Sequence, residues 1–238
     1  MVPPGQWTDN DWIAVGTMVG AVGSVAVAVL AIWGEPIRAW FFRARLHITI
    51  DMKEPDCIGI KLVQTKVTSL PSGQPTVKQT QTDSYYFRLR VNDLSQTAAR
   101  QVEVRLTALR VKQADGTFKD DPTFQPLSLI WANSRNPQTG AGQILLSKID
   151  KDVPRHCDLC HVIHGTNPLT MDFDTEVEPY PIGGVWPTKR SAGTYEVTIA
   201  ATADNAPAVR HTLEIFYAGT WHAKPADMFS KGLTVKIK

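Results

Sequence analysis

The first part of the chain contains a long, uninterrupted run of apolar residues. No charged side chain occurs between Trp12 and Trp33. A helix of this length rises roughly 33 Å, enough to cross a bilayer core of about 30 Å. A tryptophan stands at each end, where its amphipathic ring prefers the lipid–water boundary. The pattern predicts a transmembrane helix over residues 12–34, preceded by a short tail, residues 1–11.

The charges that flank this run predict its orientation. No Lys or Arg precedes it, whereas Arg38, Arg43, Arg45 and Lys53 follow it closely. Because basic residues are retained on the cytoplasmic side, we expect a single-pass protein of the cell (inner) membrane with its N-terminus outside and its large C-terminal domain in the cytoplasm. A cleaved signal peptide is disfavoured, because the start of the chain is acidic and the apolar run is too long.

Residues 35–45 combine aromatic and basic side chains. As a helix, this juxtamembrane segment would rest its aromatic rings in the headgroup layer and its arginines on anionic lipid. A plain continuation of the anchor into a first strand explains the sequence equally well. The candidate membrane-interface residues, which include the tryptophans at both helix ends, are Trp12, Trp33, Arg38, Trp40, Arg43 and Arg45.

Small residues recur at every fourth position inside the apolar run. They are Gly16, Gly20, Ser24 and Ala28. This spacing places them on one stripe of a helix, where a second helix can approach closely. The stripe favours a homodimer or a partner helix, although small residues are frequent in such helices without any partner.

From Leu46 onward the hydrophobic period changes to two. Apolar side chains alternate with polar ones over residues 85–91, 102–106, 195–199, 213–217 and 233–237. This alternation is typical of antiparallel strands with one face on a core. Between Leu106 and Leu109 the phase slips, which predicts a β-bulge near Thr107.

Turn-forming residues separate these segments, as in residues 70–75, 114–118 and 134–142. No long amphipathic helix is evident after residue 46. Many short strands with this punctuation predict an all-β, immunoglobulin-like antiparallel β-sandwich over residues 46–238.

The stretch from Tyr85 to Val111 resembles the strand pairs of bacterial immunoglobulin-like modules of the CARDB type. The matching residues are Arg90-Val91-Asn92, Ser95, Ala98-Ala99 and Val102-Glu103-Val104. The glycine expected after the asparagine is absent. The resemblance implies a β-sandwich that serves as an extracytoplasmic binding or spacer unit, a location opposite to the one that the flanking charges predict.

Composition narrows the class of protein. The chain has 238 residues, a formal net charge of +2 and three cysteines. The near-neutral charge disfavours nucleic acid as a partner, and three cysteines are too few for a disulfide scaffold. The enzyme motifs G-x-S-x-G, G-x-x-x-x-G-K and H-E-x-x-H are absent, so we expect no catalytic residues.

The segment Cys157-Asp158-Leu159-Cys160-His161 has the C-x-x-C-H pattern of c-type haem attachment, and His164 follows it. In that interpretation the thiols bond the haem vinyl groups and His161 binds iron. A zinc site built from the same residues is the second alternative, and a redox dithiol is the third. In a regular strand Cys157 would point away from Cys160. A structural or incidental role, without a cofactor, is therefore favoured.

Two charged strand faces are further candidates. The basic strand faces, Arg88 and Arg90 with Arg105 and Arg110, would attract an acidic ligand or nucleic acid, or pair with Asp93 and Glu103. The alternating acids Asp172, Asp174, Glu176 and Glu178 would line one face of a strand and hold a cation or meet a basic partner, but the solvated outer face of a strand is favoured.

Together these patterns predict a membrane-anchored, non-catalytic β-sandwich that acts in recognition or assembly at the bilayer. Its partner is an unknown protein or small-molecule ligand. Two alternatives stay open. The first is an anchored haem or zinc protein that uses the C-x-x-C-H motif. The second is a membrane effector whose β-domain senses a ligand and rearranges the helix.

Overall fold

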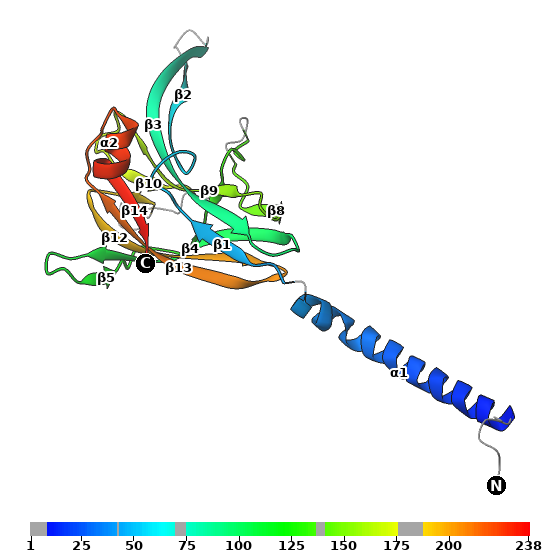
Figure 1. Ribbon diagram of the computed structural model, residues 1–238. Coiled ribbons are helices and arrows are strands. Elements are labelled where there is room, and N and C mark those ends of the chain that lie inside the picture. Colours follow the sequence, from blue (N-terminus) through cyan, green and yellow to red (C-terminus); the bar gives the residue numbers. More distant parts are fainter. Residues whose placement is uncertain (1–8, 42, 70–74, 137–140, 176–187) are drawn as a thin grey trace. The chain divides into compact units, whose positions relative to one another are not determined.

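The computed structural model describes residues 9–41, 43–69, 75–136, 141–175 and 188–238 (Figure 1). The chain divides into two compact units, Met1–Arg43 and Ala44–Lys238. The first contains helix α1 (Asp9–Phe41), and the second contains the strands.

Helix α1 is long and apolar enough to cross a membrane. Its most apolar stretch, Asn10–Val29, has a mean hydropathy of 2.0 over 20 residues. The hydroxyl groups of Thr17 and Ser24 donate hydrogen bonds to carbonyl oxygens one turn earlier, at 2.8 and 2.9 Å. These bonds satisfy both hydroxyls inside the helix, as an apolar environment requires.

The juxtamembrane segment continues this helix. The backbone stays helical through Pro36 to Phe41, so no break separates residues 12–34 from the residues that follow. Trp12 is well exposed at the start of the helix. For Trp33, Arg38 and Trp40 the structure describes the backbone alone, so the interface role of these side chains stays a prediction.

The strands form two antiparallel sheets of seven strands each. The first, sheet A, is built around the long strand β3, which pairs with β1, β2 and β9. Its strands are β1 (Leu46–Thr49), β2 (Cys57–Ser69), β3 (Pro75–Asp93), β7 (Ile130–Trp131), β9 (Arg155–Ile163), β10 (Met171–Phe173) and β11 (Lys189–Arg190).

The second sheet, sheet B, follows the order β14-β13-β12-β4, and β4 pairs along its other edge with β5, β6 and β8. Its strands are β4 (Ala99–Lys112), β5 (Phe118–Asp120), β6 (Leu127–Ser128), β8 (Leu145–Ile149), β12 (Gly193–Ala203), β13 (Ala206–Tyr217) and β14 (Leu233–Ile237). Two short helical turns, α2 (Pro225–Asp227) and η1 (Met228–Gly232), precede β14.

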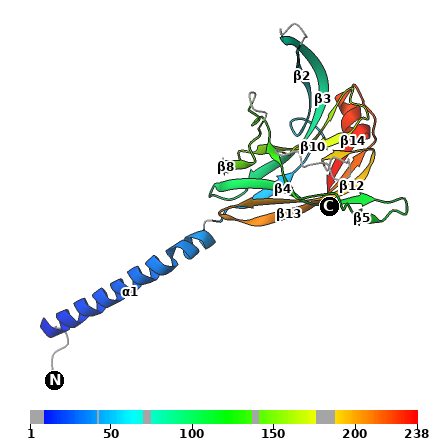
Figure 2. The ribbon, with the colours of Figure 1, turned by 180° about the vertical axis from the view of Figure 1, so that it is seen from behind.

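One hydrophobic core joins the two sheets. Phe87 and Leu89 of β3, Leu106 of β4 and Ile199 of β12 are fully buried in the same cluster. The sheets lie against each other as two layers, and the β2–β3 hairpin extends beyond them (Figure 1, Figure 2). The predicted all-β, sandwich-like fold is confirmed.

The predicted bulge is also present. Thr198 pairs with Ala108, but the next residue, Ile199, pairs with Leu106. Thr107 is therefore the extra residue of the bulge, and its hydroxyl donates a hydrogen bond to the Thr198 carbonyl at 3.2 Å. This insertion keeps both Leu106 and Leu109 in the core.

The core position of β3 can be tested with two leucines. Leu89 is fully buried, whereas Leu145 of β8 is 42% exposed. We expect Leu89→Ala to lower the free energy of unfolding by about 2–5 kcal/mol because it leaves a cavity. Leu145→Ala should change it by about 0.5 kcal/mol or less. Urea unfolding of the full chain in detergent measures both, and equal effects would contradict the assigned core.

Candidate functional site

The outer face of sheet A carries a row of polar side chains. Alternation along β3 turns these side chains away from the core, and β9 lies directly beside them. The cross-strand pairs are Tyr86–His161, Arg88–Asp158 and Arg90–His156. The sequence therefore located the basic face of β3 but not its partners.

Asp56 is the most enclosed member of this face. It is fully buried, and its Oδ1 accepts hydrogen bonds from Arg90 Nε at 3.0 Å and Nη2 at 2.8 Å. The ring Nε2 of His156 lies 3.0 Å from the same oxygen, and the backbone N–H of Asp51 donates to Oδ2 at 2.8 Å. The expected partner Asp93 instead accepts from the backbone of Arg45.

A second buried carboxylate lies at the opposite end of the row. Asp174 is 1% exposed and is bonded to His161 Nδ1 at 2.9 Å and to Arg135 Nη2 at 3.2 Å. Burial alone would lower the pKa of His161, but the charge and hydrogen bond of Asp174 raise it above its usual value. The His161 ring also stacks on Tyr86, with centroids 5.1 Å apart.

The alternating acids of residues 172–178 do not form a solvated face in the part that the structure describes, residues 172–175. Asp174 is enclosed, and burial raises the pKa of Asp172, which lies 3.8 Å from Lys189 Nζ. The expectation of solvated carboxylates is wrong for Asp174, because Asp174 follows the end of β10 and faces His161. Glu176 and Glu178 lie outside the described residues.

A β-bulge places both cysteines of the C-x-x-C-H motif in the core. Cys157 pairs with Leu89 and Asp158 with Arg88, but Cys160 pairs with Phe87, so Leu159 is an extra residue in β9. The expectation that the two thiols point to opposite faces is wrong, because the bulge shifts the alternation by one position.

The residues of the motif do not converge on one point. Cys157 and Cys160 are fully buried free thiols on the core face, whereas His161 bonds to Asp174 on the outer face. The His164 ring packs against Trp221, with centroids 4.8 Å apart. Among the described residues no group of three or more His, Cys, Asp or Glu side chains is placed to hold a metal ion. Haem or zinc at this motif requires β9 to leave the core, and both stay predictions.

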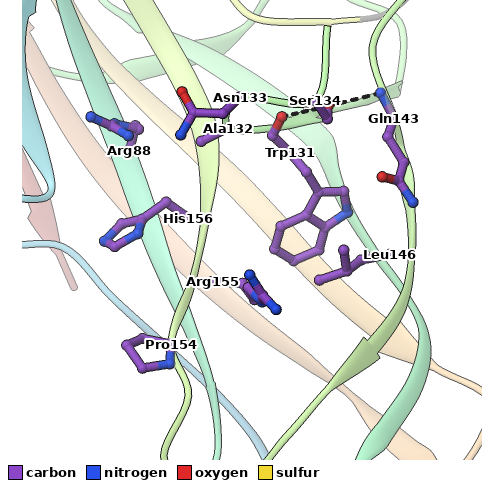
Figure 3. Close-up of a pocket in the computed structure, with 10 residues that line it drawn as sticks. All are labelled: Arg88, Trp131, Ala132, Asn133, Ser134, Gln143, Leu146, Pro154, Arg155 and His156. Atoms are coloured by element: carbon purple, nitrogen blue, oxygen red, sulfur yellow. Dashed lines mark hydrogen bonds between the residues drawn. The ribbon is translucent and has the colours of Figure 1, made fainter.

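Two neighbouring cavities adjoin the row of polar side chains on sheet A. The larger has a volume of about 320 Å³ and lies beside β9 and the turn after β7, with its lining residues on both sides of the β9 strand (Figure 3). It is lined by Arg88, Trp131, Ala132, Asn133, Ser134, Gln143, Leu146, Pro154, Arg155 and His156. The smaller, of about 140 Å³, is lined by Ile58, Ile60, Tyr86, Arg88, Asn133, Arg135 and Asp158. Arg88 and Asn133 belong to both.

Arg88 and Asp158 form the least complete ion pair of the row. Arg88 Nε lies 3.9 Å from Asp158 Oδ1, and this buried Nε has no hydrogen-bond acceptor. Burial, reinforced by the charge of Asp174, raises the pKa of Asp158 to about 7, and Arg88 only partly offsets this. A titrating acid and an unsatisfied guanidinium beside a cavity are the features of a functional site.

Comparison with known proteins adds no family to this geometry. No family model, no curated protein and no solved structure matches the chain. The CARDB-type resemblance stays a prediction.

Burial predicts that the native thiols are unreactive. Desolvation raises the pKa of Cys57 to about 12 and those of Cys157 and Cys160 well above the usual value for a thiol. A disulfide reagent should therefore label the folded full-length chain only after urea is added, because thiolate is the reactive form. Leu145→Cys, at an exposed position, should react at once and provides the positive control. Native labelling as fast as that of the added thiol would place the motif outside the core.

The raised pKa of Asp158 predicts a stability that falls with pH. The unfolded group has a pKa near 3.8, so between about pH 4 and pH 7 only the folded state retains the proton. The free energy of unfolding therefore decreases as pH rises through this window, and the loss is complete above it. His161, whose pKa is also raised, adds a loss in the same direction as pH rises through that pKa.

The matched variants are Asp158→Asn and Asp120→Asn, the latter at a side chain that is 89% exposed. Between pH 5.5 and pH 8 the wild-type chain should lose about 2 kcal/mol more stability than Asp158→Asn. Asp120→Asn should follow the wild type. Urea unfolding in detergent at both pH values measures the difference, and identical slopes for all three chains would contradict the raised pKa.

Proposed function

We propose that this protein is a single-pass membrane-anchored recognition or assembly protein that acts without catalysis. The observation that carries the proposal is the apolar stretch Asn10–Val29, which is long and apolar enough to cross a membrane and which precedes a unit with its own core. An apolar helix without a protein partner finds its favourable environment in lipid. The β domain then works at a membrane surface.

The β domain supports recognition more than chemistry. The buried carboxylates Asp56 and Asp174 are held in ion pairs with basic side chains, and the three thiols are enclosed by the core. The two cavities, in contrast, lie beside β9 and are partly open, as ligand sites are. A cytoplasmic domain, an immunoglobulin-like topology and a dimer through the small-residue stripe belong to the same proposal.

Anchoring is tested by matched substitutions at two exposed valines. Val22 lies in the middle of the apolar helix, whereas Val63 lies on β2. The wild-type chain should stay with the membrane pellet after alkaline carbonate extraction. Val22→Arg should release a large fraction, because arginine at a helix centre costs about 2.5–3.5 kcal/mol on insertion. Val63→Arg should behave as wild type. Full release of the wild-type chain would contradict an anchor.

Orientation is tested by two reporters fused after Lys238, one active only outside the cytoplasm and one active only inside. We expect signal from the inside reporter. Changing Arg38, Arg43 and Arg45 to Gln and adding lysines after Met1 should shift signal to the outside reporter, since basic residues set the orientation. Outside signal from the wild-type chain would overturn the cytoplasmic assignment and favour the haem alternative and the CARDB-type resemblance.

A further inference from the structure

The larger cavity has a basic lining. Its lining includes two arginines and one histidine, and none of its lining residues is acidic. The histidine, His156, is already paired with Asp56 at 3.0 Å. Arg155 is exposed, and among the described residues it takes part in no ion pair. Arg88 lies 3.9 Å from Asp158, so Arg155 is the basic lining group without a carboxylate beside it, and its charge favours an anion at the rim.

Arg88 supplies a buried donor that points to the same conclusion. Its side chain is only 10% exposed, and its Nε has no acceptor. A buried charged donor without an acceptor costs free energy, and a ligand oxygen recovers it once the Arg88 side chain turns Nε toward the cavity that it lines. Asp158, at 3.9 Å, is too far away to accept a hydrogen bond from Nε.

Asn133 places a second donor beside the guanidinium. Its backbone has φ of +60°, a left-handed conformation that asparagine adopts more readily than most residues. In Figure 3 its side chain lies on the same side of β9 as Arg88 and His156. The tight turn after β7 therefore presents this amide to the cavity.

We propose that this cavity binds a small organic anion whose carboxylate or phosphoryl group pairs with Arg88. The amide of Asn133 is a further donor, and Arg155 attracts the anion at the rim. A guanidinium offers paired N–H groups that match both kinds of oxygen anion. The volume of about 320 Å³ is at the lower end for small-molecule pockets. This inference rests on the proposed recognition function and names the ligand class.

Asp158 competes with the ligand for Arg88. Its carboxylate is the nearest negative charge to this guanidinium and lies on the adjacent strand. When Asp158 is ionised it offsets part of the charge that attracts an anion. Removing that charge without changing the shape of the side chain should therefore tighten binding, whereas removing the charge of Arg88 should weaken it.

The experiment is isothermal titration calorimetry of the full-length chain in an uncharged detergent at low salt and pH 8. The probes are inorganic phosphate, succinate and the neutral analogue succinamide. We expect millimolar or tighter binding of at least one anion and none of succinamide. Arg88→Gln should weaken binding by about tenfold or more, the effect of losing one charge-assisted hydrogen bond. Arg105→Gln, at an exposed arginine of sheet B, should leave binding unchanged.

Asp158→Asn is a second variant that keeps both arginines of the cavity. We expect it to tighten anion binding roughly threefold to tenfold. Near-ultraviolet circular dichroism checks that each variant is folded. The proposal is overturned if neither anion binds, if succinamide binds equally well, or if folded Arg88→Gln and Asp158→Asn both bind like the wild type. Because carbonate extraction and the reporters do not involve this cavity, the anchor can be confirmed while the anion site fails, and the reverse.

Discussion

A carboxylate that is shut away from water must be surrounded by donors, and Asp56 shows how strongly this requirement shapes sheet A. Its four hydrogen bonds come from β3, from β9 and from the loop between β1 and β2. An unpaired charge at this depth would cost several kcal/mol. The loop, the long strand β3 and its neighbour β9 are therefore held in one arrangement by a single buried acid.

The same requirement is met unevenly along the sheet. Asp56 and Asp174 each have short bonds to basic side chains, but Arg88 and Asp158 between them are 3.9 Å apart. The incomplete pair is also where the two cavities meet. The ion pairs at both ends of the row are tight, and the pair between Arg88 and Asp158 in the middle is loose. The proposed anion site is thereby separated from the carboxylates that hold the strands together.

Local patterns in the sequence predicted the helix, the alternating strands and the bulge at Thr107, because each changes the spacing of neighbouring apolar residues. The bulge in β9 gave no such signal. Cys157, Leu159 and Cys160 are all apolar and buried, so the segment shows no alternation of apolar and polar residues that an insertion could interrupt. The partners of Arg88 and Arg90 lie in distant segments that only the folded sheet brings together. Site geometry of this kind depends on register between strands, which a single sequence does not encode locally.

The extra residue in β9 changes what the cysteine motif means. Counted along the chain, Cys157 and Cys160 are three residues apart; counted across the ladder, they occupy successive positions on one face, opposite Leu89 and Phe87. A chain without Leu159 would keep both thiols in the core, and its motif would read C-x-C. The C-x-x-C spacing of this segment therefore includes a local irregularity of the backbone. Where a strand contains such an insertion, residue counts along the chain differ from positions on its face.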